Sequence, residues 1–371
     1  MKIPTPNSGD QTDNHAGPDR ADAWHKTDEE AYRVAELVRD GKSAKEIANL
    51  LYRHHGEKEL GRVSTLIRHA FARKILDITP PTNPDLERAL AAASAARITF
   101  HVVNNDHIAQ DEASNPPDTF RADAVCRQAA ALIAARIQKL LADSAHGPGP
   151  VVVANAGGFA LSRVVHFLAE QKHPAARADA SRLLFLSLNA ASLPATFGLN
   201  ANFLAVRMSE IYGARHLARS PIWPEALEKE YEHALQHLDL LVCGAGSENG
   251  LLAVWLKNHA DIPLPKDACG DICLLPIKRD GTPARQPASI ARRLEDALHP
   301  RPGYDQLRQL AKDDRIIYVA TGYEHEDRRR DPVAAAVTPH SKLAVTHAVL
   351  SQPLTRTCVL GATLARDLLK P

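Results

Sequence analysis

The chain has 371 residues, which is long enough for two domains, the larger of which can bury a full core. A hydrophobic share of 44% and a formal net charge of +1 exclude a polycation that coats nucleic acid indiscriminately, so any DNA affinity must come from a local patch. Aromatic residues make up only 5%, which disfavours stacking on single-stranded nucleic acid. The first residues lack an apolar leader and no apolar run reaches membrane-spanning length, so we expect a cytoplasmic protein.

Residues 1–26 are polar and rich in Asp, Asn, Gly and Pro, which predicts a disordered tail. Residues 27–79 then predict three helices with start signals and apolar stripes at helical spacing. The first begins at Thr27 and ends at Gly41, the second is capped by Ser43 with Glu46 in a capping box, and the third runs from Leu60 to Lys74. The predicted inner faces comprise Ala31, Val34, Ala35, Leu37, Val38, Ile47, Ala48, Leu50, Leu51, Val63, Leu66, Ile67, Ala70 and Phe71.

The third helix is locally basic, because no acidic residue lies between Glu59 and Asp77. A helix of this kind can enter the major groove, where Arg pairs with guanine edges and Ser or Thr bonds to bases or phosphates. A helix-turn-helix therefore predicts DNA contacts from Arg62, Ser64, Thr65, Arg68, His69 and Arg73.

A small oligomerisation or docking module with a solvated basic face is the alternative interpretation of these helices. The segment from Tyr52 to Glu59 is longer than the tight turn of the simplest helix-turn-helix. Either the second helix continues into this segment or the turn is expanded.

After a proline-rich linker at residues 80–84, residues 85–371 predict one α/β domain. Strands alternate with helices, which favours a mostly parallel sheet with helices on both faces. The expected strands are residues 97–103, 150–154, 182–188, 238–243, 271–276, 315–320 and 356–360, and residues 107–118 form a polar loop.

Three of the expected strands are followed closely by glycines: Gly157-Gly158, Gly244 with Gly246, and Gly322. Ligands of open parallel sheets bind at the carboxyl ends of strands, where glycine lets backbone N–H groups approach an anion. This arrangement favours a phosphorylated or polyhydroxylated ligand. Lys342 at the start of a later helix is a candidate phosphate contact, against the alternative of a solvated lysine.

No dinucleotide fingerprint or P-loop motif is present, so neither NAD nor ATP is expected, and we predict no cofactor. Cys269 and Cys273 lack a second pair or a His cluster at zinc spacing. Buried thiols beside a strand are favoured over a metal site.

Several segments, in order, resemble the SorC family of bacterial sugar-responsive transcription regulators, including its DeoR-like members. The matching segments are Ala44 to Leu50, Val63 to Ala70, Asp239 to Gly246, Ala268 to Ile272 with Asp280-Gly281 downstream, and Lys342 to Val345 followed by Thr357 to Ala362.

This resemblance implies a winged-helix or helix-turn-helix reader joined to a sugar-phosphate-sensing domain whose fold is related to sugar-phosphate isomerases. It implies a double-stranded DNA operator, a phosphorylated sugar effector and a homodimer or homotetramer. Carried over by position, the effector site comprises Gly157, Gly158, Gly246, Asp271, Gly322 and Lys342; we add Ser247, which directly follows Gly246.

The chain departs from the family pattern in the effector domain. Phe159 and Ala160 occupy the places of a phosphate-holding hydroxyl residue, and Tyr323 to Ser341 is inserted before the lysine. The insertion contains Arg328 to Arg330, which is either a replacement anion clamp or a solvated loop. Gly361 to Thr363 replaces the acidic residues usual after the last strand.

Two other functions remain open from the residues. An isomerase or hydrolase of this fold would use Asp271 or Glu248 as a base, but no paired carboxylates, nucleophile elbow or metal set accompanies them, so we do not expect an enzyme. A constitutive DNA binder with a vestigial pocket is consistent with the missing hydroxyl residue beside Gly158.

Overall fold

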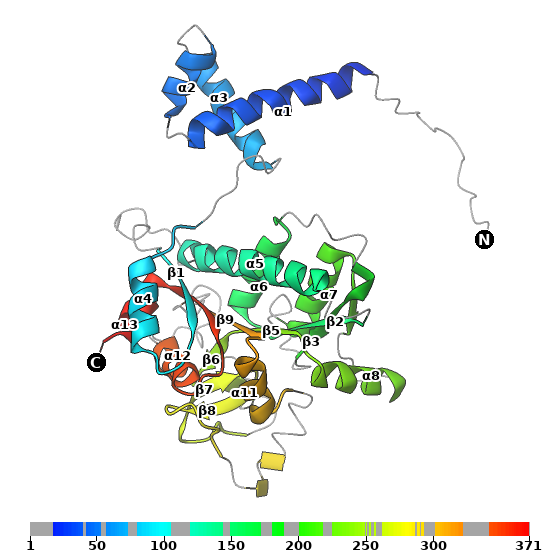
Figure 1. The fold of residues 1–371 in the computed structure, drawn as a ribbon, viewed down its shortest axis with the longest axis vertical. Helices are drawn as coiled ribbons and strands as arrows, with labels where there is room; N and C mark the ends of the chain where they lie inside the picture. Colours follow the sequence, from blue (N-terminus) through cyan, green and yellow to red (C-terminus); the bar gives the residue numbers. More distant parts are fainter. Residues whose placement is uncertain are drawn as a thin grey trace, which may run out of the picture. The chain divides into compact units, whose positions relative to one another are not determined.

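A computed structural model of the chain is shown in Figure 1. It describes residues 18–39, 42–52, 57–72, 80–104, 119–143, 149–171, 180–188, 200–217, 225–248, 262–285, 301–321 and 341–370, with 250, 252–253, 256, 288–289 and 291–292. The chain divides into two compact units, Met1–Thr79 and Pro80–Pro371.

The described part of the first unit consists of helices α1 (Pro18–Arg39), α2 (Ala44–Leu51) and α3 (Glu57–Ala72). The predicted helix start at Thr27 is wrong, as is the disordered tail over residues 18–26, because α1 already begins at Pro18. Proline is favoured in the first turn of a helix, because its missing N–H has no partner there in any case. Residues 1–17 lie outside the described residues.

The predicted capping box at the start of α2 is confirmed. The Glu46 backbone N–H donates to Ser43 Oγ at 3.3 Å, and the Ser43 N–H donates to Glu46 Oε2 at 2.7 Å. The bond from the Ser43 backbone favours the ionised carboxylate and lowers the pKa of Glu46. Two of the backbone donors that a helix start leaves unsatisfied are thereby paired.

The core of this unit contains the inward residues of all three helices: Ala31, Val34, Ala35, Ile47, Ala48, Val63, Leu66 and Ala70. Leu50 was expected on the inner face, but its residue surface is 61% exposed, so that prediction is wrong. Helix α2 ends at Leu51 and α3 begins at Glu57, so the predicted start at Leu60 is wrong and the second helix does not continue to it; residues 53–56 lie outside the described residues. Acidic and straight-chain residues at Glu57 to Glu59 suit the first turn of a helix.

The predicted linker at residues 80–84 is instead built into the second unit. Asn83 caps α4 (Pro84–Ala93) by accepting from the Leu86 N–H at 3.1 Å. The Asn83 N–H donates to the Val102 carbonyl at 2.7 Å, and the Asn104 N–H donates to the Pro81 carbonyl at 2.7 Å. The segment is therefore held along a strand by backbone hydrogen bonds.

The mostly parallel α/β fold predicted for the second unit is confirmed. Its main sheet has seven parallel strands in the order β1-β10-β9-β5-β2-β3-β4. The strands are β1 (Thr99–Val103), β2 (Val151–Asn155), β3 (Leu183–Ser187), β4 (Arg215–Leu217), β5 (Leu240–Cys243), β9 (Ile316–Ala320) and β10 (Thr357–Gly361). The remaining helices are α5 (Thr119–Ala142), α6 (Phe159–Leu168), α7 (Ala201–Tyr212), α8 (Glu225–Gln236), α11 (Tyr304–Lys312), α12 (Ser341–Ser351) and α13 (Ala362–Leu368).

Helices cover both faces of this sheet, and successive strand residues alternate between the two faces. Val151 and Val153 of β2 pack with α5, α6 and α7, which lie together along one face in Figure 1. Val152 and Ala154 pack into the opposite core with residues of α4, α8, α11, α12 and α13. Burial on both faces explains why these strands read as continuous apolar runs.

A second, antiparallel sheet is formed by β6 (Ala245–Ser247), β7 (Ala268–Ile272) and β8 (Leu275–Lys278). The single strand predicted at residues 271–276 is therefore wrong: the chain reverses at Cys273 and Leu274. Both residues have positive φ, 49° and 63°, as a two-residue hairpin turn of type I′ requires. The residues normally found in such turns are Gly, Asn and Asp, so the sequence carried no turn signal here.

Gly281 follows β8, and its backbone presses against helix α12. It has φ of 79°, and a Cβ there would lie 2.3 Å from the Ala348 carbonyl oxygen. Gly213, which ends α7, has a similar φ of 67°, but a Cβ there would meet nothing within 4 Å. Both glycines therefore have a left-handed backbone conformation, but only at Gly281 would an added Cβ collide with neighbouring atoms.

This difference predicts the stability of two alanine variants. Gly213→Ala should lower the free energy of unfolding by about 1–2 kcal/mol, because a residue with a Cβ is disfavoured in the left-handed conformation. Gly281→Ala adds a steric overlap with α12, so we expect it to lower the free energy of unfolding by roughly 1–3 kcal/mol more. Urea unfolding of both variants measures the difference, and equal losses would show that α12 yields without cost.

Candidate functional site

The exposed face of α3 is the candidate nucleic-acid surface. Ser64, Thr65 and Arg68 are exposed there, and His69 is half-buried. Thr65 Oγ1 donates to the Gly61 carbonyl at 2.9 Å, and Arg68 Nη2 donates to Thr65 Oγ1 at 3.3 Å. Within the described residues Arg68 makes no ion pair, so its positive charge is available to a phosphate or a base edge. Arg73 lies outside the described residues.

Arg62 differs from Arg68, because it is already paired within the unit. Its Nη2 donates to both carboxylate oxygens of Glu30 on α1, each at 2.7 Å. Its guanidinium also lies over the Tyr52 ring, 4.8 Å from the ring centroid. Hydrogen bonding to Glu30 raises the pKa of Arg62. Arg62 is half exposed, and exposed ion pairs contribute at most about 1 kcal/mol to stability, so the pair changes local charge more than it changes folding.

The carboxyl end of β2 leads into the first glycine pair of the predicted effector site. Gly158 has φ of 113°, which strongly favours glycine, and it precedes the first residue of α6 without a side-chain cap. Helix starts present backbone N–H groups and a partial positive charge, which suits an anion. Phe159 and Ala160 form the first turn, and both are half-buried.

Lys342, in the first turn of α12, approaches the same end of the sheet. Its Nζ donates to the Ala245 carbonyl at 2.7 Å, which ties α12 to the start of β6. Its charge also acts on Cys126 of α5, whose Sγ donates to the Ala160 carbonyl at 3.4 Å. Burial raises the pKa of the Cys126 thiol, and the positive charges of Arg163 and Lys342 oppose that rise. The start of α6 and the lysine therefore lie in one region, as the predicted site requires.

Gly246 and Asp271 are brought together as register partners in β6 and β7. A Cβ on Gly246 would lie 2.3 Å from Asp271 Oδ1, so a larger residue at position 246 would displace the Asp271 carboxylate. Asp271 is buried, and its Oδ2 accepts from the Leu274 N–H at 3.1 Å in the hairpin turn. Both residues thus have a packing role that needs no ligand, and a direct effector contact remains a prediction for them. Ser247 is buried opposite Gly270.

The sequence reasoning missed a buried polar cluster at the ends of β2 and β3. Asn155 is fully buried, and its Nδ2 donates to the Ala201 and Ala156 carbonyls at 3.1 and 3.2 Å. Among the described residues, its Oδ1 has no hydrogen-bond partner. Ser187 Oγ donates to Asn202 Oδ1, and Tyr231 Oη donates to the Ser187 carbonyl. A polar residue that closes an apolar strand, at both Asn155 and Ser187, was the available signal.

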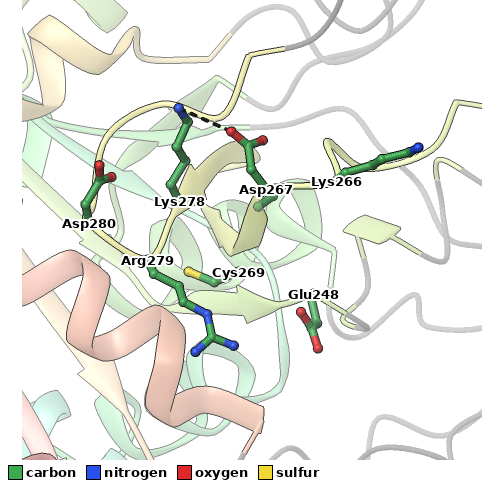
Figure 2. A pocket seen from close by; sticks show the side chains of 8 residues that line it. Glu248, Lys266, Asp267, Cys269, Lys278, Arg279 and Asp280 are labelled. Carbon is green, nitrogen blue, oxygen red and sulfur yellow. Dashed lines mark ion pairs between the residues drawn. The ribbon is translucent and has the colours of Figure 1, made fainter.

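An open pocket of about 480 Å³ lies over the small sheet, away from these residues (Figure 2). Its charged lining is mixed: Glu248, Lys266, Asp267, Lys278, Arg279 and Asp280. Lys278 Nζ lies 3.2 Å from Asp267 Oδ2. Of the two candidate bases, Glu248 lines this pocket and Asp271 does not, so the pocket does not bring them together.

Other predicted features can be placed only in part. Gly322, Arg328 to Arg330 and the predicted loop at residues 107–118 lie outside the described residues. Cys269 and Cys273 are buried thiols, as predicted. In the part of the chain that the structure describes, no three metal-ligating side chains gather, and no helix is long and apolar enough to cross a membrane.

No protein-family model and no curated protein sequence matches the chain. Solved structures do match its fold. The full-length sorbitol operon regulator SorC from Klebsiella pneumoniae matches with a TM-score of 0.52 and 16% identity, over 93% of this chain and 100% of that one.

Two further structures match with a TM-score of 0.50. One is a domain of a possible sugar-binding transcriptional regulator from Arthrobacter aurescens TC1, with 20% identity over 77% of this chain and 97% of that one. The other is a transcriptional regulator from Streptococcus pneumoniae TIGR4, with 13% identity over 77% of this chain and 95% of that one. At these identities the likeness is one of fold, and the chain has the fold of SorC-type transcriptional regulators, as its sequence motifs predict.

Proposed function

We propose that this protein is a DNA-binding transcriptional regulator of the SorC type, whose operator affinity is controlled by a phosphorylated sugar or a related metabolite. The observation that carries the proposal is the exposed face of α3, where Ser64, Thr65 and Arg68 stand clear of the core. These side-chain types bond to base edges and phosphates in the major groove. The match to full-length SorC along 93% of the chain supports the same function.

The ligand-binding part of the proposal rests on the carboxyl edge of the main sheet. The start of α6 offers backbone donors, and Lys342 brings a positive charge into the same region. An anion is the ligand that both features suit. The buried amide of Asn155 adds a hydrogen-bond acceptor that a ligand hydroxyl can satisfy. A phosphate and hydroxyl groups together describe a sugar phosphate.

In this mechanism, a homodimer or homotetramer places two copies of α3 in successive major grooves of the operator. The effector regulates by binding one assembly state more tightly than the other, because a ligand with equal affinity for both states shifts nothing. Catalysis is not part of the proposal, since Asp271 does not line the pocket described above and Glu248 lies there among side chains of mixed charge with no second group assigned to a reaction.

Substituting Arg68 tests the DNA-binding part. An operator is first enriched from random duplex DNA with the full chain. We expect Arg68→Gln to weaken binding to it by about 1–3 kcal/mol, which is roughly 5- to 150-fold, because a bidentate base contact is lost. Arg33→Gln on α1 is the matched control, as Arg33 is exposed and paired with Glu29 at 3.0 Å. Fluorescence anisotropy measures both variants. Enrichment of no sequence, or equal losses in both, would contradict the proposal.

Thermal unfolding against sugar phosphates and the matching free sugars tests the effector part. A phosphorylated sugar at about 100 times its Kd should stabilise the chain by about 2.7 kcal/mol, and the free sugar should not. Lys342→Met should abolish that ligand-induced shift, whereas Lys312→Met, which removes an exposed lysine of α11, should preserve it. The shift is compared within each variant, since losing the bond to the Ala245 carbonyl lowers the starting midpoint. No shift with any phosphate would point to the vestigial-pocket alternative.

A further inference from the structure

The ion pair between Glu30 and Arg62 joins three helices of the first unit at the recognition helix. Glu30 comes from α1, Arg62 from α3, and Tyr52 closes α2. Arg62 lies in the N-terminal half of α3, the half of a recognition helix that approaches DNA. The pair therefore lies where a bound duplex would approach the protein.

The pair leaves the arginine accessible while neutralising its charge. The Arg62 side chain is 52% exposed and that of Glu30 is 28% exposed. Both carboxylate oxygens accept from the same nitrogen, Nη2, at 2.7 Å, so the carboxylate is engaged with one nitrogen of the guanidinium. The Tyr52 ring holds the guanidinium in place from another side. Phosphate oxygens accept from guanidinium N–H groups as carboxylate oxygens do, so Glu30 competes with a phosphate for Nη2 of Arg62.

We infer that Glu30 acts as an internal substitute for a DNA phosphate, and that it sets the specificity of the reader by lowering its sequence-independent affinity. This inference rests on the proposed DNA-binding function. Each phosphate contact adds affinity on every sequence, whereas base contacts distinguish sequences. An arginine held by Glu30 contributes little to the first kind of binding, while the unpaired Arg68 keeps its full charge. Glu30 is in this sense a positioning residue, because it acts through Arg62.

The test measures how the affinity for non-specific DNA depends on salt. The full chain is titrated into a labelled mixed-sequence duplex of about 30 base pairs, because each phosphate contact steepens the slope of log affinity against log salt by about 0.9. Glu30→Gln is nearly isosteric and releases Arg62. We expect its slope to be steeper by about 0.9, so that its affinity relative to the control falls about threefold between 50 and 200 mM salt.

Glu29→Gln is the matched control, because it removes the same charge from the neighbouring residue of α1, where Glu29 pairs with Arg33. Its slope should equal that of the unmodified protein. The double variant Glu30→Gln with Arg62→Gln should also return to that slope, because the gain depends on the released arginine. If the ion pair only held α1 to α3, the dependence of DNA affinity on salt would not change with the presence of Arg62.

Three results would overturn the inference. The first is an equal slope for Glu30→Gln and Glu29→Gln. The second is a steeper slope that persists in the double variant, since Arg62 would then not be its source. The third is a loss of helical circular dichroism in Glu30→Gln, which would make the pair a structural tie. If the unmodified protein binds no duplex under any condition, the proposed function itself fails, and this outcome is distinct from the other three.

Discussion

The second unit depends on one constraint, the burial of a fully parallel sheet on both faces. Parallel strands need crossover connections, and each crossover places a helix over one face of the sheet. Alternate residues such as Val152 and Val153 therefore serve two different cores. The same connectivity directs every strand of the sheet the same way, so the carboxyl ends of β2, β3 and β5 share one edge. The buried Asn155 and the start of α6 lie at that edge as a consequence of topology.

The small antiparallel sheet shows how glycines that suggest a ligand can instead serve packing. Gly246 and Gly270 lie where strands and α12 approach too closely for a Cβ: at Gly270 it would lie 2.2 Å from the Gly246 carbonyl oxygen. Asp271 supports the hairpin turn at Cys273 and Leu274, two residues with positive φ. The buried Arg301 also binds this turn, donating to the Leu274 carbonyl. Gly246, Gly270 and Asp271 thus stabilise the small sheet to which Lys342 is bonded through the Ala245 carbonyl. This packing role does not depend on a ligand.

In the first unit, similar residues on one helix differ in their electrostatic partners. Arg62 and Arg68 look equivalent as basic residues of the exposed face of α3. Glu30, far away in the sequence, neutralises one and leaves the other charged. With a net charge of only +1, the overall charge offers little attraction for DNA, so under the proposed function the state of individual arginines sets the affinity.

The sequence by itself determined features that depend on local patterns: the capping box of Ser43 and Glu46, the helical apolar stripes around Val34 and Val63, and the apolar parallel strands. These are confirmed because caps and side-chain periodicity act over a few residues. Tertiary structure alone decided the pairing of Gly246 with Asp271, the hairpin at residues 273–274 and the capture of Arg62 by Glu30. Those features depend on contacts between segments distant in sequence, or on backbone conformations that the residue types do not predict, such as the positive φ of Cys273 and Leu274. For the same reason the polar cluster around Asn155 emerged only when the strand ends were brought together.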